Sequence, residues 1–497
     1  MNISMFLQMA AQTCPDRVAL CNPDGRYTYD ELHRAAHNAA ALIKASGREY
    51  LVVLDTSSAA VAIGLMGAAL AGVPYVPLNY RLTDSELKEL LDRVMPALLI
   101  ASPAQLQRIG ARPDASIFTR SQFLDHAFSG DAMLDEIAED PSAVAVQLFT
   151  SGTTGKPKAA ILRHEHLVSY ILGSVEFMSA EEEEGTLVSV PPYHIAGISA
   201  LMSSIYACRK IVQLPDFNAG DWLAACHREQ VTNAFVVPTM LSRIMEHVDS
   251  NPSMPVPASL RAIAYGGGKM PVQVIEKALD KFPHVSFTNA YGLTETSSTI
   301  ALLDPDDHRM AIGSDDMVIR RRLGSVGRPL PALEIEVRDD EGNVLGANEP
   351  GEIFVRGPQV SGEYLERKAI LDDGWFPTRD SGYIDEHGYL YLSGRADDII
   401  VRGGENISPS EIEDVLMRHP AVLDVAVVGK PSEEWGEAVA AAVVLRDGYD
   451  VPAADLQAMV RTELRSSRVP EAIQFVRELP YNETGKLLRR VVKQYFV

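Results

Sequence analysis

Helix-like and strand-like patterns alternate along the N-terminal part of this chain, and that alternation restricts the folds open to it. Residues 27–45 have Thr-Tyr-Asp-Glu near their start, at 28–31, and carry apolar residues at helical spacing. Residues 51–54 form a short apolar, β-branched run. Residues 61–70 are typical of a buried helix, 73–77 of a strand and 84–94 of a further helix. The alternation predicts an α/β fold, in which helices cover the faces of a sheet.

The length of the chain and a change in its pattern indicate more than one domain. A chain of 497 residues exceeds what one hydrophobic core usually organises. From about Leu333, segments 334–337 and 352–355 alternate polar with apolar residues and are separated by Gly-rich turns, which is typical of antiparallel strands. That pattern ends at 389–392, and strand and helix patterns then alternate again. We therefore place a linker at 395–398.

The formal net charge of -22 excludes some classes of partner. A protein of this charge repels phosphate backbones and anionic lipid surfaces, so we expect no nucleic-acid partner. A polyanion could still bind where local cations and backbone amides overcome the overall field. Sites that concentrate such groups are therefore the places to look for function.

The cysteines and the apolar segments bear on the compartment. Cys14, Cys21, Cys208 and Cys226 show neither a CxxC pair nor a His-rich neighbour, which fits free thiols in a reducing cytoplasm. Residues 1–11 have no basic stretch before an apolar one, and the apolar run 61–76 is broken by glycines and a proline. We expect a cytoplasmic protein with no signal peptide and no membrane span.

Residues 148–158, Leu-Phe-Thr-Ser-Gly-Thr-Thr-Gly-Lys-Pro-Lys, run from an apolar strand into a loop rich in hydroxyls, glycines and lysines. Glycine lets backbone N–H groups converge on an anion, hydroxyls donate to its oxygens, and Lys158 neutralises its charge. The spacing of glycine and lysine differs from that of the Walker loop. The segment predicts phosphate binding, and the alternative is a solvated Ser/Thr turn between strands.

Other segments carry groups suited to a nucleotide. In Asn-Ala-Tyr-Gly-Leu-Thr-Glu, residues 289–295, Tyr291 could stack on a base while Glu295 holds Mg²⁺, which takes one or two hard oxygen ligands from a protein. Asp380, in a Thr-Arg-Asp-Ser-Gly segment, is suited to accept both ribose hydroxyls. The alternatives are a helix capped by Thr294 and an ordinary turn acid. Taken alone, a terminal Gly-Lys pair that ends at Lys486 would be surface.

These segments, in this order and at these separations, resemble the adenylate-forming superfamily of acyl-coenzyme A synthetases, peptide-synthetase adenylation domains and luciferases. The resemblance covers nearly the whole chain and includes Tyr193-His194 and the Gly-Gly-Gly turn at 266–268. It implies an α/β protein with a large N-terminal domain (1–396) of two α/β subdomains plus a β-barrel. A small mobile C-terminal α/β domain (397–497) would follow.

The resemblance also implies the activity. Such an enzyme is an ATP-dependent carboxylic acid:coenzyme A ligase, which forms acyl-AMP and pyrophosphate and then acyl-CoA and AMP. Its cofactors and co-substrates would be ATP, Mg²⁺ and coenzyme A. Since a carboxylate must attack a phosphorus atom surrounded by negative oxygens, fixed cations and alignment of the two anions would lower the barrier.

The resemblance assigns roles at the nucleotide. The loop from Thr150 to Lys158, with Ser151, Gly152, Thr153 and Thr154, would hold the β- and γ-phosphates. Tyr291 would stack on adenine, Thr294 would contact the α-phosphate and Glu295 would bind Mg²⁺. The ribose hydroxyls would be held by Asp380 and Arg395, and the adenine and acyl pockets would be lined by Gly266 and Gly267.

Further roles concern catalysis and the thiol. Lys486 would bridge the carboxylate and the α-phosphate, and His194 resembles the aromatic gate beside the thiol tunnel; the alternative for His194 is a capped turn histidine. Asp397 matches the hinge about which the C-terminal domain rotates between the two steps. That rotation would bring Gly404 to the tunnel. Trp435 and Arg468 match positions that contact the nucleotide of coenzyme A.

The predicted acyl pocket favours a hydrophobic acid. Its segments 195–199 and 234–240 are mostly apolar, and neither has an Asp or Glu to pair with the ammonium of an amino acid. A fatty, alicyclic or aromatic acid is therefore expected. The alternative is a short dicarboxylate such as malonate, whose second carboxylate could pair with Arg243. Lys269, which follows the Gly-Gly-Gly turn, is expected to be solvated.

Two other functions fit the same segments. One is an acyl-AMP or carrier-protein ligase, and the other is a non-catalytic acyl or nucleotide sensor. The joint presence of Lys158, Glu295, Asp380 and Lys486 argues against a sensor. The sequence leaves open which acid is used and whether the chain forms a homodimer.

Overall fold

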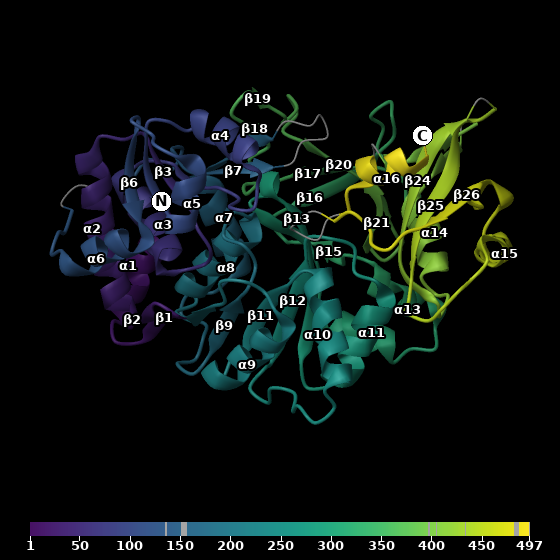
Figure 1. Cartoon of the computed structure of the whole chain (residues 1–497), viewed down its shortest axis with the longest axis horizontal. Helices are drawn as coiled ribbons and strands as arrows, with labels where there is room; N and C mark the ends of the chain where they lie inside the picture. The colour runs from purple at the N-terminus through teal and green to yellow at the C-terminus, as the bar shows by residue number, and fades with distance from the viewer. Residues whose placement is uncertain are drawn as a thin grey trace.

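The computed structural model describes residues 1–134, 137–150, 157–395, 398–403, 405–432, 434–481 and 487–496, and its N-terminal part contains two large sheets with helices packed on them (Figure 1). In the described part of the chain, the strand order of the first sheet is β15 (Arg328–Pro329), β14 (Ser298–Leu303), β13 (Ser286–Leu293), β12 (Ala262–Gly266), β11 (Asn233–Val236), β9 (Gly185–Val188), β10 (Lys210–Gln213), β1 (Val18–Asn22) and β2 (Gly25–Thr28). The strands from β13 to β1 pair in parallel.

The second sheet is also largely parallel. Its order, within the described ranges, is β19 (Arg367–Lys368), β18 (Glu363–Tyr364), β8 (Lys158–Arg163), β7 (Val144–Thr150), β4 (Tyr75–Pro77), β3 (Tyr50–Leu54), β5 (Ala97–Ala101) and β6 (Ala115–Thr119). The helices of these two units are α1 (Ser4–Thr13), α2 (Tyr29–Ser46), α3 (Ala59–Ala71), α4 (Asp84–Asp92), α5 (Pro103–Ile109), α6 (Arg120–Ser129), α7 (His164–Ser174), α8 (Ile195–Tyr206), α9 (Ala219–Glu229), α10 (Pro238–Ser250), α11 (Val272–Lys281), α12 (Pro305–Ile312) and α13 (Met317–Arg320). The two predicted α/β subdomains are confirmed.

The early helices begin and end where local signals place them. The side chain of Thr28 accepts a hydrogen bond from the backbone of Glu31, whose carboxylate accepts one from the Thr28 backbone, and this capping box starts α2. Gly47 ends α2 in the left-handed conformation. The helix predicted at 61–70 is α3, and it is buried over most of its length.

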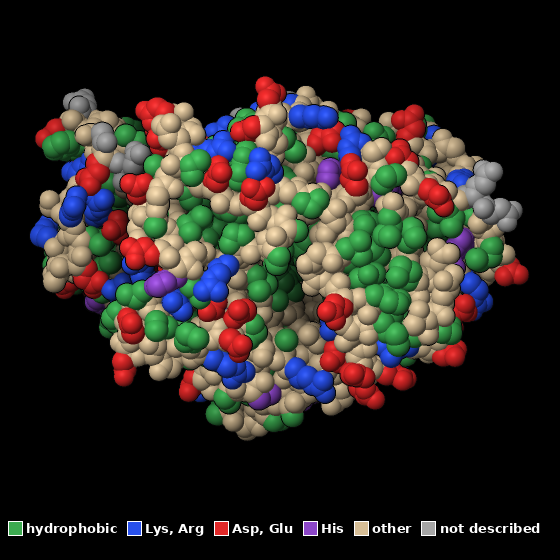
Figure 2. Space-filling model, turned by 180° about the vertical axis from the view of Figure 1, so that it is seen from behind, with side chains coloured by type: hydrophobic (Ala, Val, Ile, Leu, Met, Phe, Trp, Pro, Cys, Tyr) green, Lys and Arg blue, Asp and Glu red, His purple; other side chains and the backbone are tan. Residues whose placement is uncertain are grey.

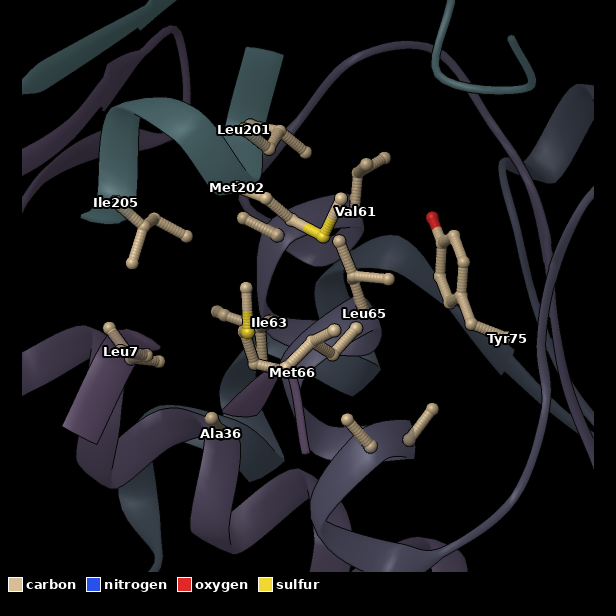
Figure 3. Close-up of a cluster of buried hydrophobic side chains, with 14 of the residues drawn as sticks. Leu7, Ala36, Val61, Ile63, Leu65, Met66, Tyr75, Leu201, Met202 and Ile205 are labelled. Carbon is tan, nitrogen blue, oxygen red and sulfur yellow. The ribbon is translucent and has the colours of Figure 1, made fainter. Parts of the chain in front are cut away.

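A single hydrophobic core joins α1, α2, α3 and α8 to the second sheet. Figure 3 shows Leu7 of α1, Ala36 of α2, Met66 of α3 and Met202 of α8 directed toward one another, with Tyr75 of β4 beside α3. These side chains are almost completely buried. Because α8 starts directly after His194, this core holds that residue in place.

The β-rich stretch is an antiparallel sheet between the two α/β units and the C-terminal part (Figure 1). Its order is β16 (Glu334–Arg338), β17 (Gly351–Arg356), β20 (Phe376–Ile384) and β21 (Leu390–Arg395). The closed barrel is not confirmed, because among the described residues β16 pairs only with β17 and β21 only with β20.

The C-terminal part forms a smaller α/β unit, drawn in yellow-green in Figure 1. Its sheet has the order β23 (Glu405–Ile407), β22 (Ile400–Arg402), β25 (Gly436–Leu445) and β24 (Val422–Ser432), and β26 (Ala472–Phe475) pairs with β25. Its helices are α14 (Pro409–Leu416), α15 (Ala453–Glu463) and α16 (Arg489–Lys493). It has a hydrophobic core of its own, which fits a separate domain.

The face of the molecule in Figure 2 shows no single charged field. Acidic and basic side chains are interspersed on the face in Figure 2, and a narrow hollow with hydrophobic side chains inside opens near its middle. Among the described residues, no helix combines the length and the apolar character needed to cross a membrane.

Candidate nucleotide site

A tyrosine, an aspartate and an arginine meet where the first large sheet adjoins the antiparallel sheet. Tyr291 lies near the end of β13 and is 8% exposed. Its hydroxyl donates to Asp380 Oδ2 at 2.6 Å, and Arg395 Nη1 lies 3.1 Å from Asp380 Oδ1. Asp380 and Arg395 are direct cross-strand partners on β20 and β21, so the antiparallel register sets this pair.

Tyr291, Asp380 and Arg395 form a triad in which the charges and hydrogen-bonding groups complement one another. Burial raises the pKa of Tyr291, and the adjacent Asp380 carboxylate raises it further, so the phenol stays protonated and donates. Burial lowers the pKa of Arg395, but Asp380 together with Tyr291, Glu295 and Asp398 more than offsets this, so the pKa is raised. A carboxylate has about four lone-pair sites, so Asp380 can still accept hydroxyl groups from a ligand.

Glu295 is a buried carboxylate one short turn after Tyr291. It lies in a 3-10 turn, Thr294–Thr296, between β13 and β14 and is 8% exposed. The hydroxyl of Tyr364 donates to Glu295 Oε1 at 2.6 Å. Burial, and then the charge of Glu295, raises the pKa of Tyr364. The backbone N–H groups of Ser361 and Gly362 donate to the Glu295 carbonyl and attach this turn to the β18 segment.

The Glu295 carboxylate fits a hard cation. Among the described side chains, Tyr364 alone hydrogen-bonds to it, at one oxygen, which leaves the other oxygen for a ligand. An anionic oxygen held in this way is the donor type that Mg²⁺ prefers, and Mg²⁺ usually takes only one or two such donors from a protein.

The predicted phosphate loop leaves one strand and enters its neighbour. Thr150 ends β7 and Lys158 starts β8, and the two are cross-strand partners. The Lys158 ammonium lies 5.8 Å from the centre of the Tyr364 ring. Lys158 therefore lies beside the tyrosine whose hydroxyl donates to Glu295. Ser151, Gly152, Thr153 and Thr154 lie outside the described residues.

The glycine turn after β12 requires glycine at two positions. A Cβ atom on Gly266 would lie 2.1 Å from the carbonyl oxygen of Ala290, on the adjacent strand β13. Gly267 has a φ of +81°, which side chains disfavour. The turn thus brings backbone close to the Tyr291 segment, where a side chain would fill the space.

His194 is the residue before α8, and its ring packs edge-on against Tyr193, with centroids 4.5 Å apart. One turn into α8, the hydroxyl of Ser298 on β14 donates to that of Ser199 at 3.2 Å. Phe235 and Met240, on the other predicted wall of the pocket, pack against the same core. The two predicted wall segments are therefore mostly apolar, with hydroxyls at Ser199 and Thr239 and with Ser298 beside Ser199.

Some of the C-terminal residues predicted to contact coenzyme A lie among the described residues, and their surroundings within the protein are as follows. Trp435 is 41% exposed, and the guanidinium of Arg402 lies 5.3 Å from its ring centre. Gly403, which packs on the same ring, donates its N–H to the Trp435 carbonyl at 2.8 Å. Arg468 forms ion pairs with Glu405 and Glu411. Asp397, Gly404 and Lys486 lie outside the described residues.

The structure bears on two residues beside the predicted acyl pocket. Lys269 is exposed, as predicted, and its ammonium also lies 2.8 Å from Asp414 Oδ2 on α14 of the C-terminal unit. Arg243 is exposed on α10, so the residue that motivated a dicarboxylate substrate faces solvent.

Sequence reasoning missed Tyr364 and Arg93. Tyr364 is 69 residues from Glu295 in sequence, and no local pattern distinguishes it. Arg93 ends α4 and donates to the Pro157 carbonyl at 2.7 Å, with its guanidinium over the ring of Phe149 at 5.0 Å. Both residues attach the ends of the phosphate-loop strands to neighbouring elements.

Comparison with known proteins agrees with this arrangement. The model of the AMP-binding enzyme family matches residues 7–365, and that of the AMP-binding enzyme C-terminal domain matches 411–486. The chain is 32% identical to 2-succinylbenzoate–CoA ligase of Bacillus licheniformis, over 97% of this chain and 98% of the relative. It is 30% identical to indoleacetate–CoA ligase of Aromatoleum aromaticum, over 99% and 98% respectively.

Solved structures match over the same length. o-Succinylbenzoate CoA synthetase of Bacillus subtilis, in complex with its acyl-adenylate intermediate, has a TM-score of 0.84 and 31% identity, covering 98% of this chain and 97% of that one. The same synthetase with ATP and a magnesium ion has a TM-score of 0.83 and 31% identity, covering 98% and 99%.

Proposed function

Because the chain belongs to the family of AMP-binding enzymes, we propose that it is an ATP-dependent acid:coenzyme A ligase that acts on an aromatic carboxylic acid. One observation carries this proposal: relatives that align with nearly the whole chain are ligases of two aromatic acids, 2-succinylbenzoate and indoleacetate. The reaction would form acyl-AMP and pyrophosphate from the acid and ATP, and then acyl-CoA and AMP.

The triad supports a ribose site beside an adenine site. Asp380, which Tyr291 and Arg395 hold in place, would accept the ribose hydroxyls. The ring of Tyr291, held by its hydroxyl, would stack on adenine against the turn formed by Gly266 and Gly267. Thr294, one residue before Glu295, would contact the α-phosphate.

The cations would act where two anions meet. Glu295 would hold Mg²⁺, which when bound neutralises charge on the ATP phosphates. The loop from Thr150 to Lys158 would hold the β- and γ-phosphates, and Lys486 would bridge the acid and the α-phosphate. Such fixed charges act without reorganisation as negative charge builds up in the transition state.

We further propose the domain division and the thiol side of the site. The N-terminal domain would span 1–396 and the mobile C-terminal domain 397–497, with Asp397 as the hinge. His194 would gate the thiol tunnel, and Gly404 and Trp435 would contact coenzyme A. The protein would act in the cytoplasm.

The apolar walls and the exposure of Arg243 support an aromatic acid over a short dicarboxylate such as malonate. A second carboxylate in an apolar pocket needs a charged or hydrogen-bonding partner, because an unpaired buried charge is costly. Arg243 faces solvent and does not supply one. The same cost would apply to the second carboxylate of 2-succinylbenzoate, so among aromatic acids the apolar walls favour one with a single carboxylate, as in indoleacetate. The Ser199–Ser298 hydroxyl pair could instead hydrogen-bond to a polar substituent of an aromatic acid.

A panel of aromatic, aliphatic and dicarboxylic acids tests the proposal, with pyrophosphate release and acyl-CoA formation measured separately. We expect both products with an aromatic acid. Adenylate without acyl-CoA would favour a carrier-protein ligase, and the absence of pyrophosphate release with every acid would refute the proposal. Lys486→Ala should abolish adenylate formation while sparing thioester formation from supplied acyl-AMP; equal loss of both half-reactions would contradict the role of Lys486.

A further inference from the structure

A cavity of about 400 Å³ lies beside the magnesium-binding carboxylate that we propose, between α4, the start of β8 and the β18–β19 hairpin. Its lining residues are Glu89, Arg93, Pro157, Lys158, Tyr364, Glu366 and Arg367. Its volume lies within the range of small-molecule sites in proteins.

The cavity carries more positive than negative charge. Its lining has three cations, Arg93, Lys158 and Arg367, and two carboxylates, Glu89 and Glu366. Arg93 is neutralised by an ion pair with Glu366. Lys158 and Arg367 form no ion pair with a carboxylate among the described residues, and both lie over the Tyr364 ring, 5.8 and 5.7 Å from its centre. Since both cations line this cavity, an anion inside it would be attracted to both.

Tyr364 connects this cavity to the reaction centre. Its ring carries the two cations, while its hydroxyl donates to Glu295 Oε1 at 2.6 Å. A negatively charged product released at Glu295 would therefore meet Lys158 and Arg367 on the other side of one side chain. In the proposed reaction, the anion released there is pyrophosphate.

We propose that this cavity binds pyrophosphate as it leaves the active site, with Arg367 and Lys158 as the residues that contact it. That pyrophosphate is the anion rests on the proposed function, whereas the position of the binding site rests on the cavity and its cations. Lys158 is shared with the predicted ATP phosphate site, whereas Arg367 belongs to the hairpin and would serve the departing product alone. An Arg367 variant therefore separates product binding from ATP binding.

Calorimetric titration of the full-length protein with pyrophosphate, without ATP or an acid, tests the site directly. We expect Arg367→Ala to raise the Kd for pyrophosphate about 1.4- to 5-fold, which is the range for one solvent-accessible charge pair. Arg367→Lys should recover most of the affinity. Lys368→Ala is the matched control, since Lys368 is the next residue, has the same charge, is exposed and does not line the cavity.

Exchange of labelled pyrophosphate into ATP, with an acid that the protein accepts, gives the second measurement. Arg367→Ala should raise the pyrophosphate concentration for half-maximal exchange by the same factor and leave the KM for ATP unchanged. Equal changes for ATP and pyrophosphate, equal effects of Arg367→Ala and Lys368→Ala, or an unchanged Kd in Arg367→Ala would each overturn the proposal. Arg367-dependent binding without exchange by the wild type would uphold the site and refute the ligase activity.

Discussion

The ion pair between Lys269 and Asp414 connects the N-terminal part to the C-terminal unit. Breaking it should change the ratio of the rates of the two proposed half-reactions. Lys269 directly follows the glycine turn of the N-terminal part, and Asp414 lies on α14 of the C-terminal unit. The Lys269 ammonium also lies 3.4 Å from the Ser410 carbonyl oxygen on the same helix. The pair therefore stabilises this particular arrangement of the N-terminal part and the C-terminal unit.

The size of the effect follows from distance and exposure. For the separation of 2.8 Å, Coulomb's law in bulk water gives about 1.5 kcal/mol. The two side chains are 40% and 52% exposed, so entropy and screening reduce the net contribution to roughly 0.2–1 kcal/mol. Loss of the pair should therefore lower the equilibrium constant for this arrangement about 1.4- to 5-fold.

The same helix is linked to the predicted hinge. Glu413, the neighbour of Asp414, accepts a hydrogen bond from Arg489 Nη2 at 2.9 Å, and Arg489 Nε lies 3.6 Å from Asp398 Oδ2. Asp398 follows the predicted hinge residue Asp397. Contacts of α14 with the N-terminal part can thus bear on the hinge through one short chain of ion pairs.

The assay measures the two half-reactions separately, as pyrophosphate exchange into ATP and as acyl-CoA formation from supplied acyl-AMP. Lys269→Ala and Asp414→Ala should each change the ratio of the two rates about 1.4- to 5-fold, and in the same direction. The charge-exchanged double variant, Lys269→Asp with Asp414→Lys, should return the ratio toward the wild-type value. The effect of the single variants should shrink at high ionic strength. Strict additivity of the two substitutions, or an unchanged ratio at low salt, would refute the reasoning.

Three further predictions concern binding and stability. Tyr291→Phe keeps the ring but removes the hydroxyl that hydrogen-bonds to Asp380. Loss of a hydrogen bond worth roughly 1.5 kcal/mol should raise the KM for ATP about ten-fold and leave the KM for the acid unchanged. Equal changes in both KM values would contradict the nucleotide role. Arg120→Ala leaves the Asp55 carboxylate, whose side chain is 1% exposed, without its cation and with the hydrogen bond from the Thr56 N–H. It should destabilise the fold by about 3–5 kcal/mol in denaturant unfolding, and a loss below about 1 kcal/mol would contradict this. Burial lowers the pKa of His164 to about 4, so between pH 6.5 and pH 4 the unfolded chain binds a proton that the folded chain does not. The free energy of unfolding should therefore fall by up to about 1.4 kcal/mol per pH unit from pH 6.5 toward pH 4. His164→Gln should reduce that slope in unfolding curves measured across this range.

Features that depend on neighbouring residues could be predicted from the sequence. The capping box of Thr28 and Glu31 marks the start of α2, and the alternation at 334–337 corresponds to β16. The boundaries shift by a few residues, since helix ends depend on cap geometry: the helix predicted at 84–94 ends at Asp92. Hydrogen bonds within a turn and the periodicity of one face operate over a few residues, so a linear pattern contains them.

The segments that carry Tyr291, Glu295 and Asp380 could also be predicted, because each combines glycine, hydroxyl and acidic residues within a few positions. The meeting of Tyr291, Asp380 and Arg395 required the register of β20 and β21 and the packing of two sheets. Tyr364 at Glu295 and Arg93 at Pro157 had no local signal, since each contact joins elements far apart in the chain.

The sequence by itself therefore determined the α/β class, most of the early helices and strands, and the segments that carry nucleotide chemistry. The tertiary structure alone decided which cations are neutralised: Lys269 pairs with a carboxylate 145 residues away, whereas Lys158 and Arg367 share an aromatic ring. The physical reason is that Coulomb energy and burial depend on distance in space, which packing sets and which separation along the chain does not record.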